Sequence, residues 1–142
     1  MNKKLLGALV AAGVVAVATY AMYQVGGERL ALLDEKIETI RVSKSTGLGL
    51  NNEESVVAIE EVEQIAVLEA ALRNAKLQSG VLPEATPEYD LMVEYQNGLP
   101  SHPLHLWLGE EGEEALVTYT VNYEEVYKIS AKDADEIRKV IR

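Results

Sequence analysis

The fold is decided by the stretch YDLMVEYQNGLPSHPLHLWL, which runs from Tyr89 to Leu108. Residues 89–95 place tyrosine, leucine and valine at every second position, with Asp, Met and Glu between them. An alternation with a period of two predicts a β-strand that buries one face. Asn97 and Gly98 both tolerate positive φ and are typical of a hairpin turn, although two nearby prolines indicate a wider loop. The stretch therefore predicts two antiparallel strands.

The second of these strands separates two kinds of side chain. Three leucines fall on one face, and His105 and Trp107 fall on the other, because side chains alternate along a strand. If the leucines meet the helices, His105 and Trp107 lie on the outer face of the sheet. An exposed tryptophan on such a face indicates a binding patch. The alternative is that Trp107 is packed against the stalk, or lies in the core with the leucines outside.

Further strands are predicted on both sides of this stretch. Residues 37–46 alternate loosely and contain β-branched side chains, and residues 56–59 form a short apolar run. Downstream, residues 114–120 and 125–129 are predicted strands that are separated by a turn at 121–124. The links between the last four strands are short and therefore require antiparallel pairing.

Two amphipathic helices complete the predicted domain. Residues 61–77 carry apolar side chains at spacings of three and four, with acidic residues near the start and basic residues near the end, as the helix dipole favours. A second helix begins after Ser130, which forms a capping box with Asp133, and runs to the C-terminus. The order of elements predicts an α+β fold with two layers, in which an antiparallel meander sheet of about five or six strands packs on the two helices.

The N-terminus has the composition of a membrane segment. Two lysines precede an uncharged, largely apolar run from Leu5 to Val25, which as a helix spans roughly 31 Å, about the thickness of a bilayer core. The lysines favour a cytoplasmic N-terminus and a single-pass protein with its C-terminal domain outside the cytoplasm. A cleavable signal peptide is the alternative, because Ala16-Val17-Ala18 has the form of a cleavage site.

These features divide the chain into three parts. We expect residues 1–27 to be a membrane anchor or signal segment, residues 28–36 a stalk, and residues 37–142 an extracytoplasmic domain, which is secreted if the segment is cleaved. After Gly27 there are 11 basic and 23 acidic residues, a net charge of −12. Such a surface repels phosphates, so nucleic acid is not an expected partner and the expected contact with the membrane is the N-terminal helix.

No motif predicts catalysis or a bound metal. The chain has no cysteine, which excludes disulfides and thiolate nucleophiles. His102 and His105 have an H-x-x-H spacing, but residues three apart on a strand point to opposite faces, and zinc would need further ligands. The acidic residues of 109–114 and the pair Asp133 and Asp135 do not match a calcium loop. We therefore expect no catalytic residue, no metal site and no cofactor.

Three short motifs occur in the predicted domain. They are Pro87-Glu88-Tyr89-Asp90, His105-Leu106-Trp107-Leu108, and Tyr127-Lys128-Ile129-Ser130 before the closing helix. Together they resemble the YhfM-like domain family over roughly residues 55–142. The resemblance implies a small exported protein of Gram-positive bacteria without established chemistry. The chain lacks the cysteine of a lipobox, and its residues 121–125 replace an Asp-Thr-x-Thr hairpin, so neither lipid attachment nor a role for those hydroxyls carries over.

These observations favour a membrane-tethered, non-enzymatic extracytoplasmic domain that binds another envelope protein or peptide, with His105 and Trp107 as a surface patch. The alternative is a small secreted hydrolase or a metal-dependent enzyme that uses His105 and neighbouring carboxylates. The position of His105 distinguishes the two functions. An enzyme requires the imidazole in a cleft and within hydrogen-bond reach of Asp or Glu, whereas a flat, open sheet face favours binding.

Overall fold

A computed structural model of the protein describes residues 35–54, 56–78 and 80–142. The predicted anchor, residues 1–27, lies outside the described residues. No helix within the described ranges is long and apolar enough to cross a membrane.

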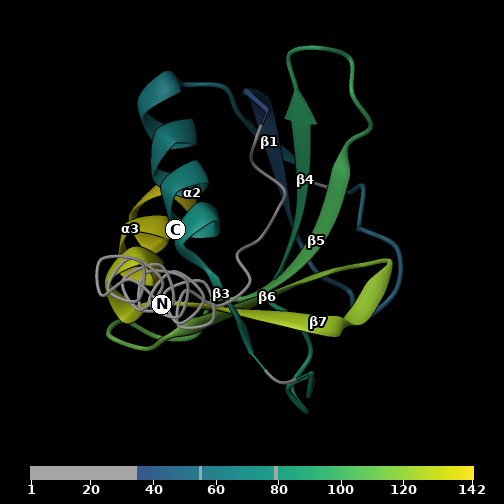
Figure 1. Ribbon diagram of the computed structural model, residues 1–142, viewed down its shortest axis with the longest axis vertical. Coiled ribbons are helices and arrows are strands. Elements are labelled where there is room, and N and C mark those ends of the chain that lie inside the picture. Colours follow the sequence, from purple (N-terminus) through teal and green to yellow (C-terminus); the bar gives the residue numbers. More distant parts are fainter. Residues whose placement is uncertain (1–34, 55, 79) are drawn as a thin grey trace, which may run out of the picture.

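One antiparallel sheet forms the centre of the described domain (Figure 1). Within the described residues it has seven strands in the order β2-β1-β4-β5-β6-β7-β3, so the predicted meander of four strands is present as β4 to β7. The strands are β1 (Ile37–Lys44), β2 (Val57–Ile59), β3 (Lys76–Gln78), β4 (Tyr89–Tyr95), β5 (His102–Trp107), β6 (Ala115–Tyr119) and β7 (Asn122–Ile129).

The pairing of β4 with β5 confirms the hairpin predicted from the decisive stretch. Leu91 lies opposite Leu104, and Tyr89 lies opposite Leu106, so the apolar residues of both strands share one face. Gly98 has a φ of 66° in the connection, a conformation that glycine adopts without strain. The connection between the two strands projects at the top of Figure 1.

Two helices, α2 (Val62–Asn74) and α3 (Ala131–Ile141), lie side by side on the leucine face of this sheet (Figure 1). Leu68 and Leu72 of α2 and Ile137 of α3 are fully buried in one core with the leucines of β4 and β5. The Ser130 side chain accepts a hydrogen bond from the Asp133 N–H at 3.2 Å, as the capping box predicted. The two-layer α+β fold is therefore confirmed for the described domain.

The sheet has one more strand than the five or six that were predicted, because the first helix ends early. Ala75 is extended, with φ −61° and ψ 139°, and the next three residues form β3. Leu77 lies opposite Tyr127 of β7 and packs against the core. Pairing with the free edge of β7 therefore overrides the helical periodicity, which a three-residue strand cannot reveal by itself.

Leu68 provides the test of this core. The change Leu68→Ala removes a fully buried side chain from under the sheet, and should lower the free energy of unfolding by about 2–5 kcal/mol. Chemical denaturation measures this loss. Val62→Ala is the matched control on the same helix, because Val62 is 76% exposed and its truncation should change stability by less than about 0.5 kcal/mol. Equal effects of the two changes would contradict the packing described.

Candidate functional site

A row of buried side chains crosses the outer face of the sheet, opposite the helices. Strand register places one residue from each of five neighbouring strands in this row, and all of them are at least 95% buried. The row consists of Ser43, Asp90, His105, Thr118 and Val126. Buried polar groups need hydrogen-bond partners. The four polar side chains of the row therefore show where hydrogen bonds are formed inside this face of the domain.

His105 lies at the centre of the row and is fully buried. Its Nδ1 is 2.7 Å from Oδ1 of Asp90, and its Nε2 is 3.1 Å from the carbonyl oxygen of Gly49. The imidazole stacks on the ring of Tyr123, with centroids 6.1 Å apart, and forms a T-shaped contact with Trp107, with centroids 6.4 Å apart. Asp90, Gly49, Tyr123 and Trp107 therefore surround the imidazole ring.

The second oxygen of Asp90 holds a loop, which we call the covering loop (residues 45–54). Oδ2 of Asp90 accepts a hydrogen bond of 2.6 Å from the Asn52 N–H. The Asn52 side chain donates to the Lys44 carbonyl, and the Ser43 hydroxyl donates to the Asn52 carbonyl at 2.6 Å. One carboxyl group thus joins the central histidine to the loop above it.

The partners of His105 fix how many protons the pair carries. The Gly49 carbonyl can only accept a hydrogen bond, so Nε2 of His105 must carry a proton. The contact with Asp90 then needs one more proton, either on Nδ1 or on the carboxyl group. Both arrangements have a net charge of zero. A neutral pair avoids the free-energy cost of burying an uncompensated carboxylate.

Trp107 anchors a second irregular segment, residues 80–88, on the same face. Its indole Nε1 donates a hydrogen bond of 2.7 Å to the Ala85 carbonyl, and the side chain is 8% exposed. The prediction that His105 and Trp107 form an exposed patch is therefore wrong. The leucines face the helices, but the covering loop and residues 80–88 fold over the opposite face of the sheet.

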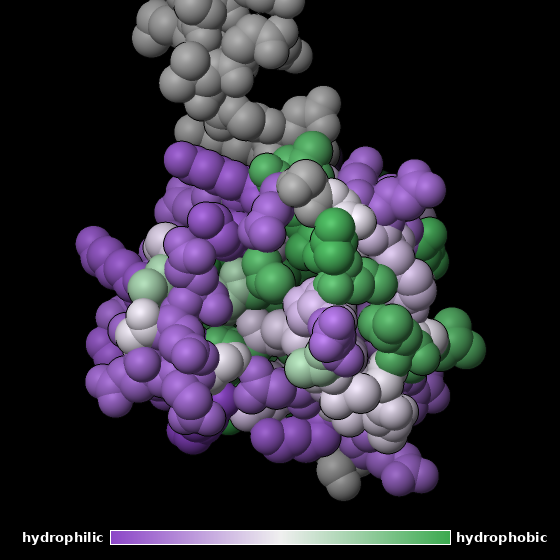
Figure 2. Space-filling model, turned by 90° about the horizontal axis from the view of Figure 1, so that it is seen from below, coloured by the Kyte–Doolittle hydropathy of each residue, from purple (hydrophilic) through white to green (hydrophobic). Residues whose placement is uncertain are grey.

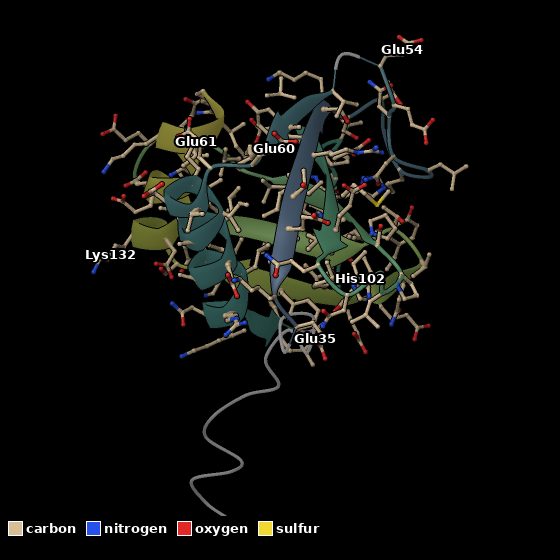
Figure 3. The ribbon with its side chains drawn as sticks, turned by 90° about the horizontal axis from the view of Figure 1, so that it is seen from above. Glu35, Glu54, Glu60, Glu61, His102 and Lys132 are labelled. Carbon is tan, nitrogen blue, oxygen red and sulfur yellow. The ribbon has the colours of Figure 1, made fainter. Side chains whose placement is uncertain are left out.

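The two histidines are not brought together. His102 lies on the helix side of the sheet, where its Nδ1 is 2.8 Å from the Tyr95 hydroxyl (Figure 3 labels His102). Burial lowers the pKa of His102 and raises the pKa of Tyr95 to about 12. The phenol therefore donates to a neutral imidazole at neutral pH. Within the described residues, no group of three His, Asp or Glu side chains could hold a metal ion.

The Asp90–His105 pair has the chemistry of a base with an orienting carboxyl group, but its imidazole is fully buried. Its Nε2 is bonded to Gly49, and the imidazole has no exposed surface. The nearby Ser43 hydroxyl donates to a backbone carbonyl and not to the histidine. An enzyme requires an imidazole that contacts an acid and that a substrate can reach. His105 meets the first condition but not the second, because its side chain is fully buried.

Above this buried row, the surface carries four large aliphatic side chains, which we call the apolar patch. They are Leu48 (53% exposed), Leu50 (90%), Val81 (75%) and Val121 (81%). Figure 2 shows hydrophobic residues gathered on one side of the face seen from below. Isolated exposed hydrophobic residues are common, whereas residues gathered from separate segments mark interaction surfaces.

Direct contacts bring the three segments of the patch together at the β6–β7 hairpin. The Gly49 N–H donates a hydrogen bond of 2.8 Å to the Tyr123 hydroxyl. Gly80 lies against the backbone of Glu124, the residue after Tyr123. A Cβ atom at position 80 would be only 2.3 Å from the carbonyl oxygen of Glu124. The patch has no signature in the sequence, because its members lie in loops without periodicity.

The burial of Trp107 predicts a large loss of stability on its removal. The change Trp107→Ala should lower the free energy of unfolding by about 3–5 kcal/mol, because it empties the space beneath residues 80–88 and leaves the Ala85 carbonyl without its donor. Chemical denaturation measures the loss. Leu50→Ala is the control from the exposed patch and should leave stability within about 0.5 kcal/mol of the native value. A Trp107→Ala protein as stable as this control would contradict the burial.

Comparisons with known proteins come to the same fold. A thioesterase-like protein from Clostridium sporogenes ATCC 15579, a crystal structure at 1.70 Å resolution, is similar with a TM-score of 0.61 and 11% sequence identity. The similarity covers 74% of this chain and 94% of that chain, and at this identity it concerns the fold alone. A comparison with curated proteins finds no match. The model of the YhfM protein family matches residues 34–142. Because that match spans the whole described domain, the chain belongs to the YhfM protein family.

Proposed function

We propose that this protein is a non-enzymatic extracytoplasmic domain, tethered to the membrane by its N-terminal segment, that binds another envelope protein or peptide through the apolar patch. The observation that carries the proposal is the exposure of Leu48, Leu50, Val81 and Val121 on segments that meet at the β6–β7 hairpin. A soluble domain gains nothing from placing four aliphatic side chains in water on one surface. Burial of that area by a partner is favourable.

The patch is held in place by buried hydrogen bonds. His105 binds the Gly49 carbonyl between Leu48 and Leu50, and Asp90 binds Asn52 just after them. Trp107 fixes the Ala85 carbonyl in the segment that begins near Val81. A surface that is ordered before binding loses less conformational entropy when a partner docks. His105 and Trp107 therefore act as positioning residues and not as contact residues.

The tether follows from the N-terminal sequence. The apolar run from Leu5 to Val25 and the two lysines before it are the features that support an anchor. Residues 28–36 then lie between the anchor and β1, and fully extended they reach at most about 30 Å. The domain would work close to the membrane surface, where a tether raises its effective concentration toward a partner in the same envelope.

A second candidate function is a hydrolase that uses His105. The 2.7 Å contact between His105 and Asp90 favours it, because the carboxyl group orients the imidazole as a base requires. This function needs the covering loop to leave Nε2 of His105 open to a substrate. It therefore predicts activity that depends on His105, whereas the binding function predicts a partner that contacts Leu50.

Site-specific photo-crosslinking in intact cells tests the proposal. A photoreactive side chain at Leu50 should give one discrete adduct in the membrane fraction, and Val121→Glu should abolish it, since that change puts a charge on the same patch. The same side chain at Val62 is the control, because Val62 is as exposed but lies on α2. Identical adducts from both positions, or a protein released into the medium with a mature N-terminus at Thr19, would contradict a tethered binding domain.

A further inference from the structure

We infer that the partner of the apolar patch is a cationic amphipathic segment of a protein or peptide, in which apolar side chains alternate with Lys or Arg. This inference rests on the proposed function and specifies the chemistry of the partner. The observation behind it is an acidic rim around the patch. All three segments that build the patch lie in parts of the chain without a lysine or arginine, since none occurs in residues 45–72 or 77–127.

The acidic rim is formed by four exposed glutamates in or next to the patch segments. Glu53 and Glu54 follow Leu50 in the sequence, Glu84 follows Val81, and Glu124 follows Tyr123. Within the described ranges none of the four forms an ion pair, whereas Glu94, Glu114 and Glu88 do. Their charges are therefore available to a partner.

Two of the basic residues that flank the patch segments in sequence, Lys44 and Lys128, are already engaged. Lys44, which precedes the covering loop, donates to the Tyr89 hydroxyl at 2.9 Å and lies 4.1 Å from the centre of that ring. Lys128 pairs with Glu114, and Arg142 pairs with Glu88. The uncompensated negative charge beside the patch thus selects a positively charged partner and raises its rate of association.

The alternative occupant of an apolar patch on a tethered domain is the lipid bilayer. Two observations favour a protein segment. The acidic rim would repel anionic headgroups. The stalk enters the domain at the start of β1, near Glu35, whereas the covering loop follows the other end of that strand, and Figure 3 shows Glu35 and Glu54 on opposite sides of the domain. Glu54, one member of the acidic rim, therefore lies across the domain from the point where β1 begins.

Binding of synthetic peptides to the full chain in detergent micelles tests this chemistry. The probe is a twelve-residue peptide that alternates leucine and lysine, and its controls alternate leucine with glutamate and serine with lysine. We expect the leucine-lysine peptide to bind at least about tenfold more tightly than either control, because it alone offers both apolar area and positive charge. Equal binding of the serine-lysine peptide, or preference for the leucine-glutamate peptide, would overturn the inference.

Two variants locate the binding. A protein with Glu53, Glu54, Glu84 and Glu124 all changed to Gln should lose about tenfold in affinity and most of its salt dependence, since four weak exposed pairs are removed. Leu50→Ser should lose a similar factor without changing the salt dependence. Both changes are at exposed positions, and unchanged thermal unfolding confirms that the fold is kept.

Two further outcomes separate this inference from the proposed function. If the adduct at Leu50 persists in cells while the fourfold Gln variant captures the same partner equally well, the cationic partner is refuted and the binding function stands. If Leu50 gives no adduct and the chain binds vesicles of phosphatidylcholine and phosphatidylglycerol through the patch, both the cationic partner and the protein partner are refuted.

Discussion

The buried contact between Asp90 and His105 is the constraint on which the outer half of this structure depends. The two side chains sit in the middle of the sheet, fully enclosed, and between them they bind the covering loop at Gly49 and Asn52. A carboxylate buried without a proton or a cation would be costly, so the pair keeps a net charge of zero. The loop is therefore attached to the sheet by hydrogen bonds that are shielded from water.

That attachment connects the interior of the domain to its surface. The same loop carries Leu48 and Leu50 outward while Gly49 between them bonds inward to His105 and to Tyr123. Trp107 binds residues 80–88 to the sheet in the same way, through its hydrogen bond to the Ala85 carbonyl. The apolar core between the helices and the sheet stabilises the domain. On the outer face of the sheet, buried polar groups bind two irregular segments and hold them in one arrangement. Membership of the YhfM protein family and the similarity in fold to one solved structure describe this scaffold, and the function proposed for it lies in the surface that the scaffold presents.

The sequence predicts the regular parts of this architecture and not the parts that carry the site. Period-two alternation identifies β4 and β5, and the spacing of apolar residues identifies α2, because each signal is local. β3 is not predicted, because three residues are too few to show a periodicity. These residues form a strand only because they pair with the edge of β7. The covering loop depends on hydrogen bonds between residues far apart in sequence, such as Asn52 and Asp90, which are 38 positions apart. His105 and Trp107 are recognised as unusual, but whether a strand face is open or covered is decided by loops without a pattern of their own.

Amide hydrogen exchange of the covering loop shows whether the Asp90–His105 pair holds this loop on the sheet. In the native protein the Asn52 N–H bonds to Asp90 and the Gly49 N–H to Tyr123, so both should exchange slowly. With Asp90→Ala, the account predicts that these two amides lose their protection while the amides of α2 keep theirs, and that Glu94→Gln on the same strand changes neither. Unchanged protection of Asn52 and Gly49 in the Asp90→Ala protein would contradict the claim that the buried pair holds the loop and the surface above it.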